Sequence, residues 1–324
     1  MTTELVLLGT AGAPLPVVGR GGISSALVVD GRVFVVDCGR GSPSAFVGAG
    51  LDFTRLEAVF LTHLHADHTG DLPGLILYPW GVRESADGPL PPIHVYGPSR
   101  PEALPEGDAL FHRETTIYPE RPTPTTADLV ESILTGYAYH LNVMPLDAHM
   151  PDAGALVRGI DIHVPARTEG IPRVPVVVFD DGAVRVTAVA VTHGHAVPAL
   201  GYRFDTADGS VVFSGDTTVN DDLIALAQGA DILVHQVADL GYLKRHGTTG
   251  AELERMAGLH TDVSEVGDVA ERARVRELIL SHYLPADPDA ITEADWAERA
   301  GLGFTGTTTA GRDGLRRTLP RAAG

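Results

Sequence analysis

The sequence predicts an α/β protein in which two sheets pack face to face and helices cover their outer surfaces. Three observations support this fold class. Short apolar runs of β character recur along the chain, helical segments are interspersed among them, and their order falls into two broadly similar halves. The chain has 324 residues, which is enough for one large domain or two moderate ones with a full-sized core.

The first half is expected to be rich in strands. Asp30-Gly31 lies between two apolar runs, which is a strong short-range signal for a hairpin. Glycines and prolines within residues 9–16 force a loop after the first strand. Short helices are expected at residues 44–50 and from Asp71 onwards. The expected strands are residues 4–8, 23–29, 32–37 and 56–62.

Residues 80–175 differ in character from the rest of the chain. Fourteen of the 23 prolines lie between Pro89 and Pro175, so this region cannot be continuous regular structure. Within it, residues 93–96 are expected to form a strand and residues 127–139 a helix. We interpret the region as an insertion near the functional site that carries substrate selectivity. The alternative is a passive surface excursion.

The second half repeats the pattern of strands and tight turns. Asp181-Gly182 and Asp208-Gly209 each lie between two apolar runs, as expected for hairpins. Helices are expected at residues 223–228 and 263–274, the second because its apolar residues recur with helical spacing. The expected strands are residues 176–179, 183–192, 199–205, 210–214, 231–235 and 277–280.

The most informative stretch, residues 63–71, directly follows the fourth expected strand. It reads His-Leu-His-Ala-Asp-His-Thr-Gly-Asp, and His63 and His65 would share one face of an extended segment. A turn after them would place Asp67 and His68 at the mouth of the next helix. Neutral imidazole and carboxylate are ligands that suit zinc and its first-row neighbours. The stretch therefore predicts a metal site and not a histidine-rich surface loop.

Further candidate ligands recur where later strands end. A pair of zinc ions needs more protein ligands than the first stretch holds. Ligands on loops at one edge of a rigid sheet are a usual way to build an active site. His193 and His195 cannot both be assumed to be ligands, because one of them can merely support the other. The candidates are His193, His195, Asp216, His235 and His282.

Composition narrows the classes of partner and compartment. The chain carries 42 acidic and 24 basic side chains, a net charge of −18, and Lys244 is its only lysine. Such a surface repels a phosphate backbone, so nucleic acid is expected to be a disfavoured partner, whereas a small anionic ester is not excluded. The single cysteine, Cys38, excludes an internal disulfide and a cysteine-based zinc cage. No signal peptide or membrane span is evident, so we expect a cytoplasmic protein without a membrane partner.

Several short motifs are spread from one end of the chain to the other: Gly9-Thr-Ala-Gly12, Asp37-Cys38-Gly39, the HxHxDH of residues 63–68, Ser214-Gly215-Asp216 and Ser281-His282. Together they make the chain resemble the metallo-β-lactamase-fold, metal-dependent hydrolases over essentially its whole length. The resemblance implies a four-layer αββα sandwich of two mixed sheets. It also implies a single domain over residues 1–324, with the Pro-rich insertion beside the active site.

Within this superfamily, the chain is most similar to the branch that holds ribonuclease Z and the arylsulfatase-like enzymes. The similarity rests on His195-Ala-Val-Pro198-Ala-Leu-Gly201-Tyr-Arg203-Phe, on the Ser-Gly-Asp-Thr run, and on His260-Thr261 before a helix. The spacing from His195 to Gly201 matches this branch better than the spacing from His193. His195 is therefore assigned as the ligand.

The resemblance implies a site with two zinc ions per chain, with manganese or iron as possible substitutes. A hydroxide between the metals would be the nucleophile, because coordinated water ionises near pH 7 instead of about 15.7. Seven ligands are implied: His63, His65 and His195 on one ion, Asp67, His68 and His282 on the other, and Asp216 bridging the two.

Two catalytic residues are also implied. Asp67 would orient the attacking water. His260 matches the position of a general acid that protonates the leaving group, the alternative being a histidine that caps a helix. Gln236 stands where relatives typically have a glutamate. Because an amide cannot ionise, a charge relay through this position is not expected.

The leading expectation is a dinuclear-metal hydrolase that cleaves a small ester, either a phosphodiester or an aryl sulfate. The alternatives are tRNA 3′ processing, as in ribonuclease Z, and a lactonase. Residues 101–175 hold five Arg, no Lys and eleven acidic residues, which argues against a tRNA-gripping arm there. A non-enzymatic scaffold is disfavoured because every expected ligand position is filled. A homodimer is expected, since the resembled enzymes commonly form one.

Overall fold

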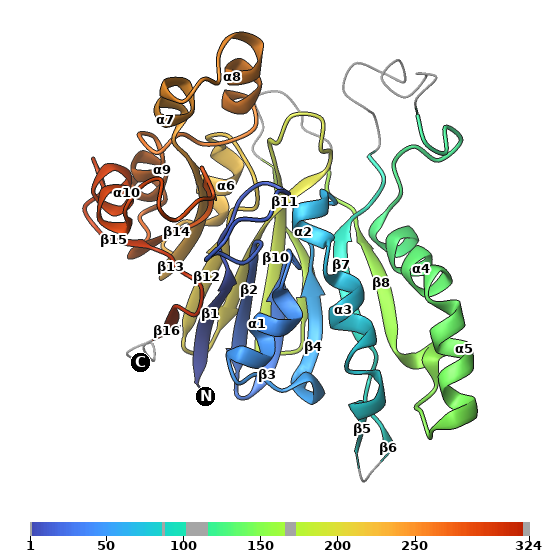
Figure 1. The fold of residues 1–324 in the computed structure, drawn as a ribbon. Helices are drawn as coiled ribbons and strands as arrows, with labels where there is room; N and C mark the ends of the chain where they lie inside the picture. Colours follow the sequence, from blue (N-terminus) through green and yellow to red (C-terminus); the bar gives the residue numbers. More distant parts are fainter. Residues whose placement is uncertain (1, 86–87, 102–115, 166–172, 320–324) are drawn as a thin grey trace.

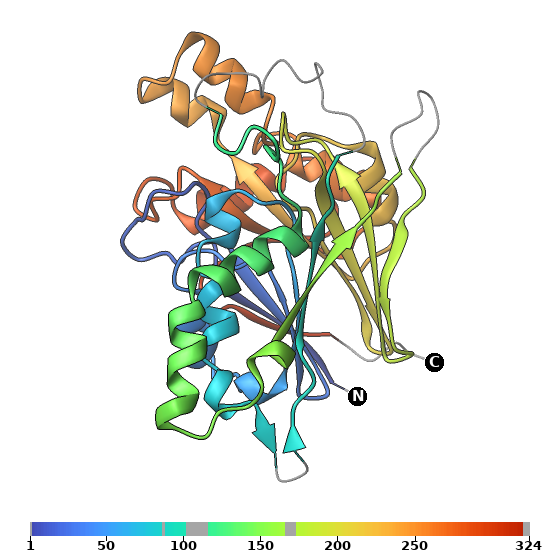
Figure 2. The same ribbon diagram turned by 90° about the vertical axis from the view of Figure 1, so that its right-hand side faces the viewer.

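The computed structural model describes residues 2–85, 88–101, 116–165 and 173–319. Two seven-stranded mixed sheets lie face to face, and helices lie on the outer side of each (Figure 1). Figure 2 shows the two sheets as adjacent layers, with the helices of the first sheet on one side of them. The predicted fold class, a four-layer αββα sandwich, is confirmed.

The first sheet comes mainly from the N-terminal half of the chain and ends at one edge with the last strand. Its first three strands pair antiparallel, whereas β3, β4, β7 and β8 run parallel to one another. In spatial order its strands are β16 (Arg316–Thr318), β1 (Thr3–Gly9), β2 (Ser24–Val29), β3 (Arg32–Val36), β4 (Leu56–Phe60), β7 (Ile93–Pro98) and β8 (Val157–Ile162).

The second sheet mirrors this arrangement. Strands β9 to β12 pair antiparallel, and β12 to β15 run parallel. All three expected Asp-Gly hairpins are present, and their glycines have positive φ, as tight hairpin turns require. In spatial order the strands are β15 (Thr307–Ala310), β14 (Glu277–Leu284), β13 (Ile232–Ala238), β12 (Gly209–Phe213), β11 (Ala199–Thr206), β10 (Val184–Val191) and β9 (Val176–Asp180).

The helices divide between the two halves of the sandwich. Among the described residues, no helix combines the length and apolar character needed to cross a membrane. A small separate hairpin is formed by β5 (Glu84–Ser85) and β6 (Gly88–Pro89). The helices of the first half are α1 (Ser42–Gly48), α2 (Ala66–Thr69), α3 (Leu72–Leu77), α4 (Thr126–Gly136) and α5 (Ala138–Asp147). Those of the second half are α6 (Asp221–Leu226), α7 (Leu240–Arg245), α8 (Gly250–Ala257), α9 (Val266–Ala273) and α10 (Glu293–Ala300).

Three apolar layers hold these four structural layers together. One lies between the sheets, and the other two lie between each sheet and its helices. Because side chains alternate along a strand, β1 contributes to two layers. Leu5 and Leu7 belong to the layer between the sheets, whereas Val6 and Leu8 pack toward the helices.

Phe60, the last residue of β4, anchors the strand that leads into the histidine cluster. Its ring stacks on Tyr96 of the same sheet, with 5.0 Å between the ring centroids. It also contacts Phe204 of the other sheet edge-on, at 5.1 Å. These contacts join the two sheets at the end of β4. The backbone that leads to His63 and His65 is therefore held rigidly.

The Pro-rich region is built into the first sheet. The expected strand at residues 93–96 is β7, and the expected helix is α4, which ends at Gly136 and is followed at once by α5. Strand β8 was not expected, because Gly159 and polar residues obscure its pattern. Gly159 is needed there, since a Cβ would lie 2.6 Å from the Cα of Ala127 in α4. Residues 102–115 and 166–172 of this region lie outside the described residues, and the single domain over residues 1–324 stays a prediction.

Candidate metal centre

The predicted ligands gather at one edge of the two sheets. They lie at or beyond the carboxyl ends of strands, where the loops of an α/β fold usually carry functional groups. His63 and His65 follow β4, while Asp67 and His68 lie in α2. The others come from the second sheet, where His193 follows β10, Asp216 follows β12 and His282 lies within β14.

Three imidazoles form the first donor group: His63, His65 and His193. The Nδ1 atom of His65 lies 2.9 Å from Nε2 of His63 and 3.3 Å from Nε2 of His193. The Nδ1 atom of His193 donates to the carbonyl oxygen of Leu259 at 2.9 Å. This hydrogen bond leaves Nε2 of His193 with a free lone pair that faces the other two rings.

The structure groups His193, and not His195, with the other donors. His193 is only 3% exposed and joins the cluster, whereas His195 is exposed and lies on the wall of a cleft outside it. Strand β10 ends at Val191, and Gly194 has a φ of 54°, so the chain turns between the two histidines. They therefore no longer share a face, and only the first points to the cluster.

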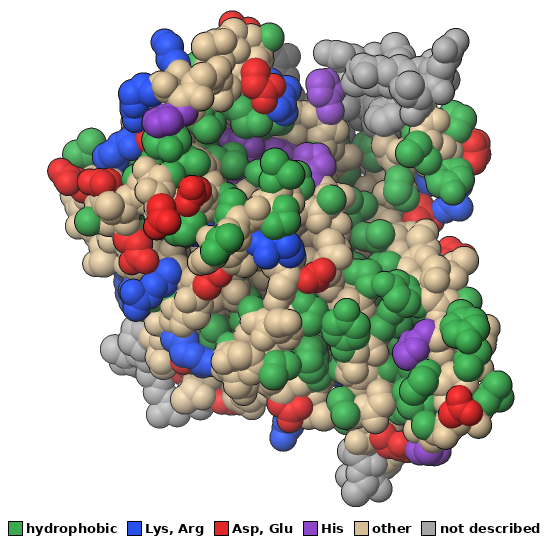
Figure 3. Space-filling model, in the orientation of Figure 1, with side chains coloured by type: hydrophobic (Ala, Val, Ile, Leu, Met, Phe, Trp, Pro, Cys, Tyr) green, Lys and Arg blue, Asp and Glu red, His purple; other side chains and the backbone are tan. Residues whose placement is uncertain are grey.

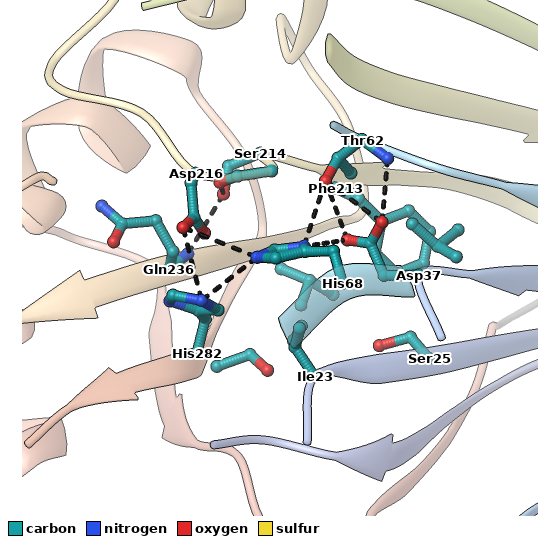
Figure 4. Close-up of a pocket in the computed structure, with 14 residues that line it drawn as sticks. Ile23, Ser25, Asp37, Thr62, His68, Phe213, Ser214, Asp216, Gln236 and His282 are labelled. Carbon is teal, nitrogen blue, oxygen red and sulfur yellow. Dashed lines mark hydrogen bonds and ion pairs between the residues drawn. The ribbon is translucent and has the colours of Figure 1, made fainter. Parts of the chain in front are cut away.

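The second donor group consists of Asp67, His68 and His282. The Nε2 atoms of His68 and His282 lie 3.2 Å apart, and Nε2 of His282 lies 3.5 Å from Oδ2 of Asp67. Asp216 lies beside His282 and His68, with Oδ2 at 3.3 Å and 3.5 Å from them (Figure 4). The same oxygen lies 3.7 Å from His193 of the first group. These ligand atoms therefore converge on a small volume.

The donor set fits divalent cations. Two imidazole nitrogens 3.2 Å apart can share only one proton, and Oδ1 of Asp216 is buried without a hydrogen-bond partner. Burial would raise the pKa of Asp216, but the neighbouring imidazoles of His282 and His68 hold it well below its usual range. Burial likewise opposes ionisation of Asp67, yet hydrogen bonding to His282 and the charge of His68 lower its pKa to about 2. Convergent imidazole lone pairs and ionised carboxylates are the ligands that zinc-like cations use.

Backbone strain marks two residues of this region. Asp37 has a φ of 58° and His282 a φ of 48°, in the left-handed region that residues other than glycine rarely adopt. Such strain persists only where the surrounding structure enforces it, and it is concentrated at functional sites. At His282 it occurs inside β14, where the register with β13 shifts.

Comparison with known proteins identifies the family. The model of the metallo-beta-lactamase superfamily matches residues 18–282. The chain belongs to this superfamily. The fold agrees with solved structures of human tRNase Z, short form, with a TM-score of 0.63 and 19% identity over 98% of this chain and 99% of that one. The metallo-beta-lactamase fold protein YhfI from Bacillus subtilis gives a TM-score of 0.62 at 18% identity over 97% and 99% of the two chains.

Relatives named ribonuclease Z match this chain over almost its whole length. That of Mycobacterium sp. (strain KMS) is 33% identical over 303 residues, 93% of this chain and 90% of the relative. That of Mycobacterium bovis (strain BCG / Pasteur 1173P2) is 31% identical over 314 residues, 96% of each. The similarity to the ribonuclease Z branch is thus confirmed, and the protein is a metal-dependent hydrolase of ester bonds.

The same finding overturns one expectation from composition. The relatives are ribonucleases by name and one solved neighbour is a tRNase, so the view of nucleic acid as a disfavoured partner is wrong. Net charge describes the average surface, whereas binding depends on the charges beside the site. Residues 240–257, which include α7 and α8, carry three basic and two acidic side chains in a chain with a net charge of −18.

Asp37 is a functional residue to which sequence reasoning gave no role, although it lies in one of the family motifs. Its Oδ2 accepts a hydrogen bond from Nδ1 of His68 at 2.8 Å, and its Oδ1 accepts one from the backbone N–H of Thr62 at 2.8 Å (Figure 4). Burial lowers the pKa of His68, but the negative charges of Asp37 and Asp216 outweigh burial and raise this pKa. Asp37 therefore orients the ring of His68 and directs its Nε2 to the donor group.

We expect Asp37→Asn to weaken metal binding by about 10- to 100-fold, because an amide cannot hold the His68 ring as a carboxylate does. Titration of the metal-free protein with zinc in the presence of a competing chelator measures the change. Asp180→Asn, on the exposed end of β9, is the matched control and should bind zinc as the unsubstituted protein does. Equal affinity in the two variants would show that Asp37 does not support the site.

His260 lies within reach of the metal centre and is held by Gln236. It is 7% exposed, and its Nδ1 lies 3.0 Å from Oε1 of Gln236. The amide nitrogen of Gln236 donates to the carbonyl oxygen of Thr217 at 2.9 Å, so Oε1 faces the ring and Nδ1 of His260 carries the proton. Burial lowers the pKa of His260 to about 4. The ring is thus presented with Nε2 as its free nitrogen.

His235, whose part in the site the sequence left open, stays apart from it. It is completely buried in β13, and its Nδ1 lies 2.6 Å from the carbonyl oxygen of Gln236. Burial lowers its pKa to about 4. Within the described ranges, it belongs to none of the groups of side chains that are close enough to share a metal ion.

Two clefts open onto the metal centre. The larger has a volume of about 510 Å³ and contains the first donor group in its floor. The smaller, of about 400 Å³, is lined by Asp67, His260 and His282. Figure 3 shows histidine side chains gathered in the hollow below α8 and Lys and Arg side chains around α7 and α8. Four of the described residues line both clefts: His65, His193, Arg255 and Leu259.

Proposed function

We propose that this protein is an endoribonuclease of the ribonuclease Z type, which cleaves a phosphodiester bond at the 3′ end of tRNA precursors. The observation that carries the proposal is the similarity to ribonuclease Z at 33% identity over 93% of the chain. This similarity supports tRNA 3′ processing better than it supports hydrolysis of a small aryl sulfate or phosphodiester. No comparable observation favours a lactonase.

The charges around the clefts suit an RNA substrate. None of the described residues that line the larger cleft is acidic, although the chain carries 42 Asp and Glu residues. Four histidines and Arg255 line it instead. The carboxylates of the smaller cleft, Asp67 and Asp216, belong to the proposed metal centre, where bound cations would offset their charge.

We propose that the centre holds two divalent cations, zinc in the first instance. When bound, a pair of such cations lowers the pKa of a water molecule and neutralises developing negative charge on a phosphate. The proposed ligands are His63, His65 and His193 for one cation, Asp67, His68 and His282 for the other, and Asp216 between them.

Side chains of the protein would carry out the remaining steps. Asp67 is ionised and accepts hydrogen bonds, so it orients the attacking water in the smaller cleft. His260 lines the same cleft with Nε2 unprotonated, so this nitrogen would first take up a proton from solvent and then pass it to the departing oxygen. Because Gln236 is neutral, it fixes the ring of His260 without stabilising a charged imidazolium.

The proposal is tested with a tRNA precursor that carries a 3′ trailer. The zinc-loaded protein should release the trailer in a single cut at the end of the mature tRNA. Parallel assays use bis(4-nitrophenyl) phosphate, 4-nitrophenyl sulfate and a lactone. Intact precursor together with rapid hydrolysis of the sulfate or the lactone would contradict the proposal. The variant Asp216→Asn, assayed at the same concentration, excludes a contaminating nuclease.

His260→Ala should lower turnover by about 10²-fold on substrates with poor leaving groups, and much less on 4-nitrophenyl esters. A nitrophenolate departs without a proton, whereas an alkoxide needs one. The measurement is the ratio of turnover on the tRNA precursor to that on bis(4-nitrophenyl) phosphate. His149→Ala, at an 83% exposed side chain, is the matched control. An equal loss on both substrates would remove the general-acid role.

A further inference from the structure

We propose that the larger cleft is a nucleotide subsite for the part of the substrate that stays attached to phosphorus after cleavage. This inference rests on the proposed function, since it assigns the two substituents of a phosphodiester to the two clefts. It also assigns a role to the Pro-rich region, which contributes one wall of the larger cleft through Pro98, Ser99, Thr123 and Pro124.

The size of the larger cleft suits this occupant. Its volume of about 510 Å³ lies within the range of small-molecule and cofactor sites, about 300–1,000 Å³. It opens directly onto His63, His65 and His193, so a group bound in it would be continuous with a phosphate at the metal centre. The cleft is therefore an extension of the active site and not a separate pocket.

The walls of the larger cleft suit a planar base. Rigid proline rings come from Pro98 and Pro124 on one wall and from Pro198 elsewhere in the lining, and Leu259 adds further apolar surface. A nucleobase presents two apolar faces and a polar edge, so it packs on such surfaces with little loss of side-chain entropy. Thr123, on the wall from the Pro-rich region, offers a hydroxyl to the edge of a base.

The position of His260 indicates which cleft holds the leaving substituent and which holds the substituent that keeps the phosphate. Hydrolysis forms a P–O bond to water and breaks the P–O bond to the leaving oxygen, and only that oxygen needs a proton. His260 lines the smaller cleft and is absent from the described lining of the larger one. The leaving substituent therefore lies in the smaller cleft, and the substituent that keeps the phosphate extends into the larger cleft.

Arg255 of α8 lies where the two clefts meet. Among the described residues, it is the one Lys or Arg side chain that lines either cleft. Its guanidinium is held by Glu252, with Nη2 to Oε1 at 2.6 Å and Nε to Oε2 at 3.0 Å, and its side chain remains 54% exposed. Glu252 occupies the Nε and Nη2 edge of the guanidinium, so Arg255 would contact the backbone of a substrate that spans both clefts through its remaining N–H groups.

The subsite is tested with two esters that share a leaving group and differ in the retained substituent. Thymidine 5′-(4-nitrophenyl phosphate) carries a nucleoside, and methyl 4-nitrophenyl phosphate carries only a methyl group. Because burial of the apolar faces of one base on these walls contributes about 10- to 100-fold in affinity, the zinc-loaded protein should prefer the nucleotide by about that factor in kcat/KM, mainly through KM.

Two variants fill the cleft from different walls, Thr123→Trp and Val197→Trp. In each, the preference for the nucleotide should fall to near one. Ile117→Trp, at a 77% exposed residue outside the described cleft lining, is the control and should keep the preference. Arg255→Gln should lower kcat/KM for both esters by a similar factor and leave their ratio unchanged.

The outcomes separate this inference from the proposed function. A ratio near one in the unsubstituted protein, or a preference that survives both tryptophan substitutions, overturns the subsite even if the tRNA precursor is cleaved. A preference that is lost in both filled variants supports the subsite even if the precursor is left intact, in which case only the proposed RNA substrate is wrong.

Discussion

Asp216→Ala should lower turnover on every ester substrate by about 10³-fold or more and reduce the amount of metal that copurifies with the protein. Asp216 is 3% exposed, and its carboxylate lies within 3.7 Å of imidazole nitrogens from both donor groups. It is grouped with His63 and His68 on one side and with His193 and His260 on the other. Its removal therefore affects both proposed cations.

Elemental analysis of the purified variant and steady-state kinetics measure the two effects. Asp216→Asn keeps the shape of the side chain and should show the same losses, which separates loss of charge from misfolding. Asp221→Ala is the control of the same residue type, since its 76% exposed side chain pairs with Arg272 at the surface. A fully metal-loaded and active Asp216→Ala protein would refute the proposed centre.

His193→Ala should lose about 10²- to 10³-fold in turnover, whereas His195→Ala should keep its metal and most of its activity. The two residues are a matched pair, two positions apart in one loop. His193 is buried with Nε2 directed at the cluster, while His195 is exposed on the cleft wall. The same metal analysis and kinetics apply to both variants. A greater loss in His195→Ala would restore the assignment made from sequence spacing.

This pair shows why the sequence alone could not decide which of the two histidines lies in the donor cluster. In an extended strand, His193 and His195 would share a face, and the spacing to Gly201 favoured the second. The strand ends before them, at Val191, and Gly194 turns the chain in the left-handed region. Spacing along a sequence does not reveal where a strand ends to within two residues, so the choice required coordinates.

Other parts of the fold could be predicted because their signals are local. Each Asp-Gly hairpin is set by the backbone freedom of one glycine, as at Gly31 and Gly182. Residues 63–68 supply four of the proposed metal ligands. This part of the donor cluster could therefore be predicted from the local sequence alone. By contrast, Asp37 acts on His68 across 31 positions of sequence, and only the packing of β3 beside β4 brings them together.

The helices α7 and α8 were not anticipated at all. They are short, and no residue of either helix is buried. Signals of this kind cannot be distinguished from a loop in the sequence. Their position matters for charge, since α8 brings Arg255 to the clefts and α7, which packs on α8, carries Lys244 in an acidic chain. A net charge taken over all residues could not reveal this local difference.

The pairing of β16 with β1 makes the first sheet depend on residues that are far apart in the chain. Val6 pairs with Arg316 and Glu4 with Thr318, so one edge of β1 is open until β16 is in place. The donor cluster has the same dependence, since His68 meets His282 across 214 positions of sequence. Contacts between such distant residues require the closure of a long loop, which slows folding. A truncated variant that lacks β14 and β16 should therefore have neither a closed first sheet nor a complete set of donors.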